Sequence, residues 1–223
     1  MGQKIRPSSL RLGITEDWNA QWFVNKSFKD RLQEDEIIRK ILLKRAENAG
    51  IAHIKIERTG DQCKITLKVA RPGIVIGRGG KGIEAITKEI ERAMKAFIKA
   101  RGKGAVPAIN LTVEEVKRAE ISAPIVAHHI AEDLEKRIPF RRTMKKYIES
   151  VMQNKEAKGV KIKLSGRLDG AEISRREQLA RGSLPLQTLR ATIDYGTATA
   201  FASYGTVGIK VWIYKGEVFP GKK

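Results

Sequence analysis

The sequence predicts an α+β protein with two domains, and three observations support this. Strict alternation of apolar and polar residues at 54–57 and 63–69, on either side of Thr59-Gly60-Asp61, is typical of an antiparallel hairpin. Apolar residues then recur at spacings of three and four over 83–97, which is typical of an amphipathic helix. In the second half, two helical patterns precede the strands.

The first domain is expected over residues 16–118, with its elements in the order α-β-β-α-α-β. A helix over 28–48 should bury one apolar face and end at Gly50. The hairpin follows, then a short helix before Gly77, the long helix and a basic turn at 101–104. The last strand alternates apolar residues. The predicted inward residues of the first helix and last strand are Ile37, Ile41, Leu42, Ile109, Leu111 and Val113.

The second domain is expected over residues 119–217, because Pro124 suits the first turn of a helix. Two helices should be separated by Pro139 and followed by a mostly antiparallel sheet. The expected helices are 125–137 and 140–155, the expected strands begin at Gly159 and cover 188–195 and 207–214, and 166–182 is read as a charged connection. Residues 1–15 are read as a basic arm rather than a packed element, and 218–223 as a short basic tail.

The charge balance points to a polyanionic partner. The chain of 223 residues has 44 Lys and Arg against 25 Asp and Glu, a formal charge of +19, and the excess is spread over both halves. A membrane-surface protein usually concentrates such charge in one segment, so nucleic acid is favoured. The single cysteine, Cys63, excludes an internal disulfide and suits a reducing cytoplasm. No signal-peptide or membrane-spanning run is visible.

Residues 77–82 contain the most informative motif. Gly77, Gly79 and Gly82 satisfy the dinucleotide-binding pattern, but that pattern needs a buried strand leading straight into it within a βαβ unit. Here Pro72-Gly73 intervenes and the preceding strands form a hairpin. The P-loop pattern also fails, because Gly82 stands where Ser or Thr must hold magnesium.

The KH domain fits better. Its signature, V-I-G-x-x-G-x-x-I, is matched in full by residues 75–83, and the α-β-β-α-α-β order resembles the type II arrangement. A KH glycine loop clamps the backbone of single-stranded nucleic acid. The alternative is that the glycines form only a tight corner between helices. The loop residues proposed to bind RNA are Gly77, Arg78, Gly79, Gly80 and Lys81.

The whole sequence resembles the bacterial small-subunit ribosomal protein S-three family, collinearly from Gly2 to about Glu217. The resemblance is carried by Gly2-Gln3-Lys4, Trp22-Phe23, the stretch 70–77, Ser165-Gly166-Arg167-Leu168, Gly170-Ala171-Glu172-Ile173, Leu189-Arg190-Ala191, Ile193-Asp194-Tyr195 and 208–214. It implies a place in the head of the small ribosomal subunit, bound to small-subunit rRNA. It also implies a basic cluster at the mRNA entry channel that grips and helps to unwind mRNA.

The matching cluster here is 140–145, Phe-Arg-Arg-Thr-Met-Lys. Apolar residues at 140, 144, 148 and 151 should form a packed stripe that leaves a basic ridge free for phosphate. A merely solvated face is the alternative. The proposed ridge is Arg141, Arg142, Lys145 and Lys146, and the proposed rRNA-binding residues of the arm are Lys4, Arg6 and Arg11.

Further implied partners are the neighbouring head proteins S-ten, S-fourteen and S-two, in a cytoplasmic, ribosome-bound setting. We expect no enzyme activity, cofactor, metal, membrane or small-molecule substrate. His128, His129, Glu132 and Asp133 have metal-like helical spacing but lack further ligands. Trp212 shares a strand face with Lys210 and could stack on a base, although packing within an assembly is favoured. The alternative function is a free-standing KH-type regulator or RNA-processing factor.

Overall fold

The computed structural model describes residues 4–24, 28–60, 62–101 and 107–219. The chain divides into two compact units. One is Trp18–Lys117, and the other combines Met1–Asp17 with Arg118–Lys223. Both contain helices and a four-stranded sheet, so the α+β class is confirmed. Most of the predicted turn at 101–104 and of the tail at 218–223 lies outside the described residues.

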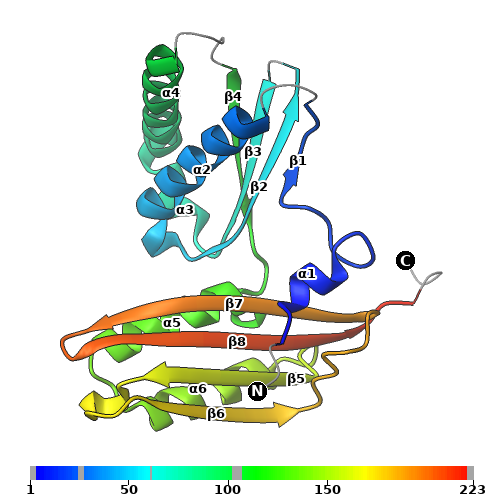
Figure 1. The fold of residues 1–223 in the computed structure, drawn as a ribbon, viewed down its shortest axis with the longest axis vertical. Helices are drawn as coiled ribbons and strands as arrows, with labels where there is room; N and C mark the ends of the chain where they lie inside the picture. The colour runs from blue at the N-terminus through cyan, green and yellow to red at the C-terminus, as the bar shows by residue number, and fades with distance from the viewer. Residues whose placement is uncertain (1–3, 25–27, 61, 102–106, 220–223) are drawn as a thin grey trace. The chain divides into compact units, whose positions relative to one another are not determined.

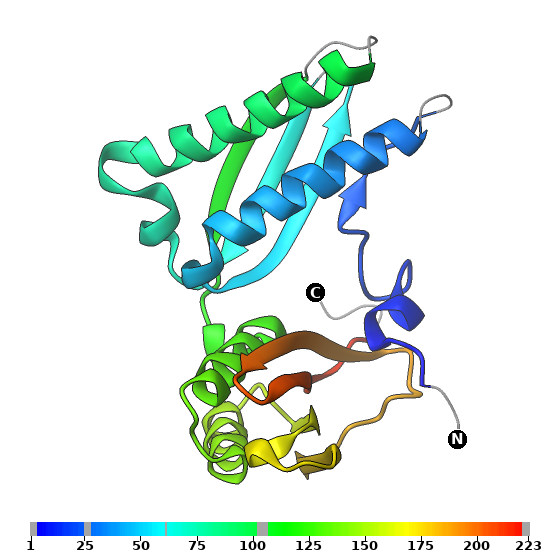
Figure 2. The same cartoon turned by 60° about the vertical axis from the view of Figure 1, so that its left-hand side comes forward.

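In the unit Trp18–Lys117, the long helices cover one face of the sheet (Figures 1 and 2). The sheet order is β1-β2-β3-β4, with β2 and β3 antiparallel, β4 parallel to β3 and β1 parallel to β2. The predicted order α-β-β-α-α-β is confirmed, and the short strand β1 is an addition at the edge. The bounds are β1 Ala20–Gln21, α2 Phe28–Arg45, β2 Ile51–Thr59, β3 Gln62–Val69, α3 Pro72–Ile76, α4 Lys81–Arg101 and β4 Ala108–Glu115.

Helix α2 buries two carboxylates that the apolar pattern did not predict. Its buried residues are Ile38 and Leu42 together with Glu34 and Asp35, whereas the predicted Ile37 and Ile41 are half-buried. The carboxylates meet Arg58 of β2: its Nη1 lies 2.6 Å from Glu34 Oε2 and its Nε 2.9 Å from Asp35 Oδ1. Burial lowers the pKa of Arg58, but the two carboxylates outweigh it and raise the pKa overall.

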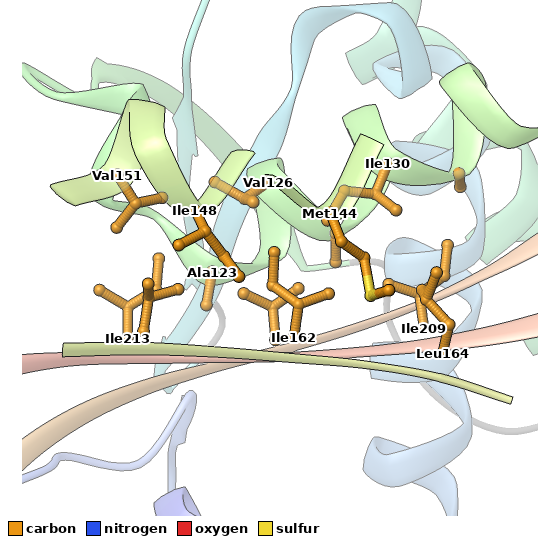
Figure 3. Packing of buried hydrophobic residues seen from close by; sticks show 14 of the residues in the cluster. Ala123, Val126, Ile130, Met144, Ile148, Val151, Ile162, Leu164, Ile209 and Ile213 are labelled. Carbon is orange, nitrogen blue, oxygen red and sulfur yellow. The ribbon is translucent and has the colours of Figure 1, made fainter. Parts of the chain in front are cut away.

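In the other unit, helices α5 (Ala123–Glu135) and α6 (Phe140–Gln153) pack on one face of an antiparallel sheet, β6-β5-β8-β7. Pro139 separates the helices as predicted. Figure 3 shows Met144, Ile148 and Val151 of α6 facing strand residues such as Ile162 and Ile213. The strand bounds are β5 Gly159–Gly166, β6 Arg175–Gly182, β7 Ala191–Ala202 and β8 Gly205–Glu217.

The interpretation of 166–182 as a connection is wrong for its second half, because β6 pairs with β5 along its whole length. Since β6 is an edge strand, only Glu177 and Leu179 are half-buried and the rest is exposed. An edge strand has little apolar alternation to show in the sequence.

The interpretation of residues 1–15 as an unpacked arm is also wrong over Pro7–Arg11. Pro7–Arg11 forms helix α1, and Arg11 is fully buried. Its guanidinium donates to the carbonyl of Ala191 at 2.6 Å, of Thr188 at 2.9 Å and of Pro7 and Leu186 at 3.0 Å each. The N-terminal segment is therefore fastened to the start of β7.

Candidate RNA-binding site

The glycine loop joins α3 to α4 and is largely exposed to solvent. Gly77, Gly79 and Gly80 have φ of 69°, 61° and 78°, in the left-handed region that favours glycine. A Cβ atom added at Gly79 or Gly80 would meet nothing within 4 Å. The outer side of the loop is therefore free to contact a ligand at the N-terminus of the 21-residue helix α4.

Gly82 has a different role from the other loop glycines. A Cβ there would lie 2.3 Å from the carbonyl oxygen of Val75 and 2.8 Å from that of Ile76. Gly82 therefore lets the first turn of α4 pack against the end of α3. Val75, predicted to fix the loop from the core, is buried, while Ile76 and Ile83 are half-buried.

Arg78 and Lys81 are exposed, and within the described ranges neither forms an ion pair. Lys81 also lines a shallow depression between α4 and the end of α2, together with Arg45, Lys88 and Arg92. Two carboxylates, Glu84 and Glu89, share that depression, and Glu89 accepts from Arg45 Nε at 2.6 Å. The two carboxylates therefore partly neutralise the cations of this depression.

The basic ridge lies on the exposed side of α6. The predicted stripe at 140, 144, 148 and 151 is buried, together with Thr143. Arg141, Arg142, Lys145 and Lys146 are all exposed and line one shallow surface depression with Glu149. The packed stripe fixes the helix, so the sequence-predicted ridge residues do come together on one surface.

The four cations of the ridge are not equivalent. Lys146 Nζ lies 3.1 Å from Asp133 Oδ2 of α5, which also accepts from the hydroxyl of Tyr147 at 3.1 Å. Burial and Asp133 raise the pKa of Tyr147, so its hydroxyl stays protonated and keeps donating. Arg141 lies 4.0 Å from Glu177, at the limit of an ion pair. Arg142 and Lys145 form no ion pair in the part of the chain that the structure describes.

The arm residues separate into two kinds. Lys4 and Arg6 are exposed, and the Arg6 guanidinium lies 5.4 Å from the centre of the Tyr195 ring. Arg11 is committed to backbone carbonyls inside the protein, and we withdraw it as an RNA contact. Its sequence context, a basic segment without nearby acids, gave no sign of this.

The remaining sequence candidates find partners within the chain. Asp133 is held by Lys146 and Tyr147, and no group of three or more metal-ligating side chains occurs within the described ranges. Trp212 packs against Tyr195, with ring centres 5.4 Å apart. Among the described helices none is long and apolar enough to cross a membrane.

A glycine loop between α3 and α4, set on a β2-β3-β4 sheet, defines a type II KH domain, a class of RNA-binding module. Sequence comparison agrees. A KH domain model matches residues 37–121, and a model described as "Ribosomal protein S3, C-terminal domain" matches residues 130–213.

Three similar proteins are each named "Small ribosomal subunit protein uS3". The one from Clostridium novyi (strain NT) is 50% identical over 224 residues, covering 100% of this chain and 96% of the relative. The one from Desulfitobacterium hafniense is 46% identical, with 100% and 96% covered. The one from Coxiella burnetii is 46% identical, with 100% and 93% covered. The chain belongs to the uS3 family of small ribosomal subunit proteins. These are structural proteins and not enzymes, so the expectation of no enzymatic activity is confirmed.

Proposed function

We propose that this chain is a structural constituent of the small ribosomal subunit head, binds small-subunit rRNA, and supplies cations that grip mRNA at the entry channel. Membership of the uS3 family supports the ribosomal role. One observation carries the mRNA role. Arg142 and Lys145 are exposed on a helix fixed by a buried stripe, and neither pairs with a carboxylate among the described residues.

The ridge chemistry suits a moving RNA strand. Arginine and lysine bind phosphate without reading a base, so the contact is independent of sequence. Arg142 and Lys145 are the principal contacts, Arg141 is weakly held by Glu177, and Lys146 is the least available because Asp133 pairs with it. A rigid row of cations would hold one strand of an incoming duplex while the other strand separates.

The KH loop is the second proposed RNA contact. Gly79 and Gly80 allow a close backbone approach, and Arg78 and Lys81 supply charge beside it. Contacts with neighbouring head proteins, the S-ten, S-fourteen and S-two proteins of the family resemblance, belong to the same proposal. So does a cytoplasmic, ribosome-bound location.

Sedimentation of a cell lysate tests the ribosomal role. We expect nearly all of the protein to co-migrate with small subunits. A largely free pool would contradict the proposal and favour a free-standing RNA-binding regulator or processing factor.

The mRNA role is tested by replacing Arg141, Arg142 and Lys145 with Ala. We expect the substitutions to slow translation of structured mRNA more than translation of unstructured mRNA. The cations that hold one strand matter only where two strands must separate. A matched variant with Lys136, Lys155 and Arg181 replaced by Ala removes the same charge from exposed positions off the ridge. Equal effects on both templates, or an equal effect of the matched variant, would contradict the entry-channel role.

A further inference from the structure

Over three rows of side chains, the face of the β6-β5-β8-β7 sheet that points away from α5 and α6 carries cations and no carboxylate. The strand registers place its side chains in three rows across the sheet. We call these positions the outer face. They are Arg176, Ser165, Gly208 and Thr199 in one row, Gln178, Lys163, Lys210 and Thr197 in the next, and Ala180, Lys161, Trp212 and Tyr195 in the third.

The acids of the same strands lie outside these three rows. Glu217, at the end of β8, lies 2.8 Å from Arg190 Nε. Glu177 alternates onto the helix side of β6, where it lies 4.0 Å from Arg141. Asp194 accepts from the Ala123 amide at 3.1 Å and from Lys215 at 3.1 Å. The segregation leaves the positive charge of the outer face without compensation from these strands.

Two lysines lie opposite each other at the centre of this face. Lys163 of β5 is the register partner of Lys210 of β8, and Lys161 is two residues along β5. Like charges directly opposite on adjacent strands are destabilising, and a spacing of two residues is only about 7 Å. This repulsion in the free protein would be relieved by a polyanion.

The aromatic residues of the outer face hold cations instead of presenting open rings. Arg6 lies over Tyr195 at 5.4 Å from the ring centre, Tyr195 packs on Trp212 at 5.4 Å, and Lys161 lies over Trp212 at 6.0 Å. Because these ring contacts are made within the protein, a ligand on the outer face would meet ammonium and guanidinium groups more readily than open aromatic rings. Its chemistry fits backbone phosphate.

We propose that the outer face binds the phosphate backbone of small-subunit rRNA, so that this unit contacts RNA on two sides. The ridge lies on α6, which packs on the opposite face of the same sheet. A protein partner would be expected to meet an apolar, desolvated centre, whereas the centre here is the Lys163–Lys210 pair. The inference rests on the proposed rRNA binding and names a surface for it.

Site-directed cross-linking in assembled subunits tests the proposal. The only native cysteine, Cys63, is fully buried, so benzophenone maleimide will label an introduced cysteine selectively. Thr197→Cys is exposed on the outer face and Glu149→Cys is exposed beside the ridge. We expect irradiation to join position 197 to rRNA, and position 149 to mRNA in translating ribosomes. Cross-linking of position 197 to a neighbouring protein, to mRNA or to nothing would overturn the inference.

A charge variant gives an independent readout. Replacing Lys163 and Lys210 with Gln should lower the magnitude of the slope of log affinity for rRNA against log salt by about 1.4 to 1.8, since each of the two phosphate contacts contributes roughly 0.7 to 0.9. Stability should be unchanged or higher, because the repulsion between the two lysines is removed. The matched variant replaces Lys136 and Lys155 with Gln.

An unchanged salt slope, or an equal loss in the matched variant, would overturn the inference. Failure of the outer face is distinguishable from failure of the proposed function. If the protein still sediments with small subunits and the ridge variant still slows structured mRNA, only the outer face is refuted.

Discussion

Replacing Arg11 with Ala should destabilise the unit that combines Met1–Asp17 with Arg118–Lys223, and should not directly weaken RNA binding. The substitution removes the guanidinium from four carbonyl oxygens, those of Pro7, Leu186, Thr188 and Ala191. The Thr188 carbonyl keeps the Ala191 amide as a donor at 3.2 Å. An unsatisfied buried acceptor costs about 1–3 kcal/mol, and water will reach the partly buried carbonyls of Leu186 and Thr188. Two fully buried acceptors at this cost, together with the lost packing of the arginine stem, give an expected loss of about 3–5 kcal/mol.

Hydrogen exchange read by peptide mass spectrometry locates this effect. The amides at the start of β7, next to Ala191, should exchange at least about a hundredfold faster in Arg11→Ala, since each 1.4 kcal/mol is a factor of ten. Burial lowers the pKa of Arg11, consistent with a guanidinium held by dipoles and little solvent. Lys4→Ala is the control, because Lys4 is exposed and should change stability by less than about 0.5 kcal/mol. Unchanged exchange in Arg11→Ala with weaker rRNA binding would refute the reasoning and restore the RNA-binding arm.

Three further predictions follow from buried contacts in the KH unit. Gly82→Ala should lower thermal stability more than Gly79→Ala. A Cβ at position 82 would lie 2.3 Å from the Val75 carbonyl oxygen, whereas a Cβ at position 79 meets no atom within 4 Å and adds only the strain of a positive φ. Equal losses of stability would contradict the packing role of Gly82. Arg58→Met should cost about 3–5 kcal/mol in chemical denaturation, because it leaves buried Asp35 without its cation and buried Glu34 with only Arg31 at 3.2 Å, and a loss below about 1 kcal/mol would refute that. Cys63 should react with iodoacetamide only after unfolding, because burial raises the pKa of its thiol and shields it; rapid labelling of the native protein would show otherwise.

The fold was readable from sequence wherever one side of an element faces the core and the other faces water. The stripe on α6 at 140, 144, 148 and 151 was predicted residue by residue, because a helix packed on a sheet needs an apolar face at that spacing. The β2–β3 hairpin followed from its alternation and its turn. Strand β6 was missed because an edge strand buries too little to impose that alternation.

The candidate site was only partly readable, because charge pairing is a property of three-dimensional neighbours. No acid separates Arg137 from Lys146 in the sequence, yet Asp133 reaches Lys146 from the preceding helix. The alternation of apolar and polar residues in β5 predicted that Lys161 and Lys163 lie on its solvent-facing side. Only the strand register places Lys210 against Lys163 and makes an acid-free face visible.

Basic residues in this chain therefore have two different roles that composition does not distinguish. Arg11 and Arg58 are buried and bind the protein's own oxygens, so removing either should act on stability. Arg142 and Lys145 are exposed on a fixed helix without a carboxylate partner among the described residues, so removing them should act on RNA. Replacing a buried arginine should therefore lower the free energy of unfolding and leave the salt dependence of RNA binding unchanged. Replacing an exposed ridge residue should do the reverse. That opposition is a stricter test of an RNA-binding surface than the net charge of +19, which counts both kinds equally.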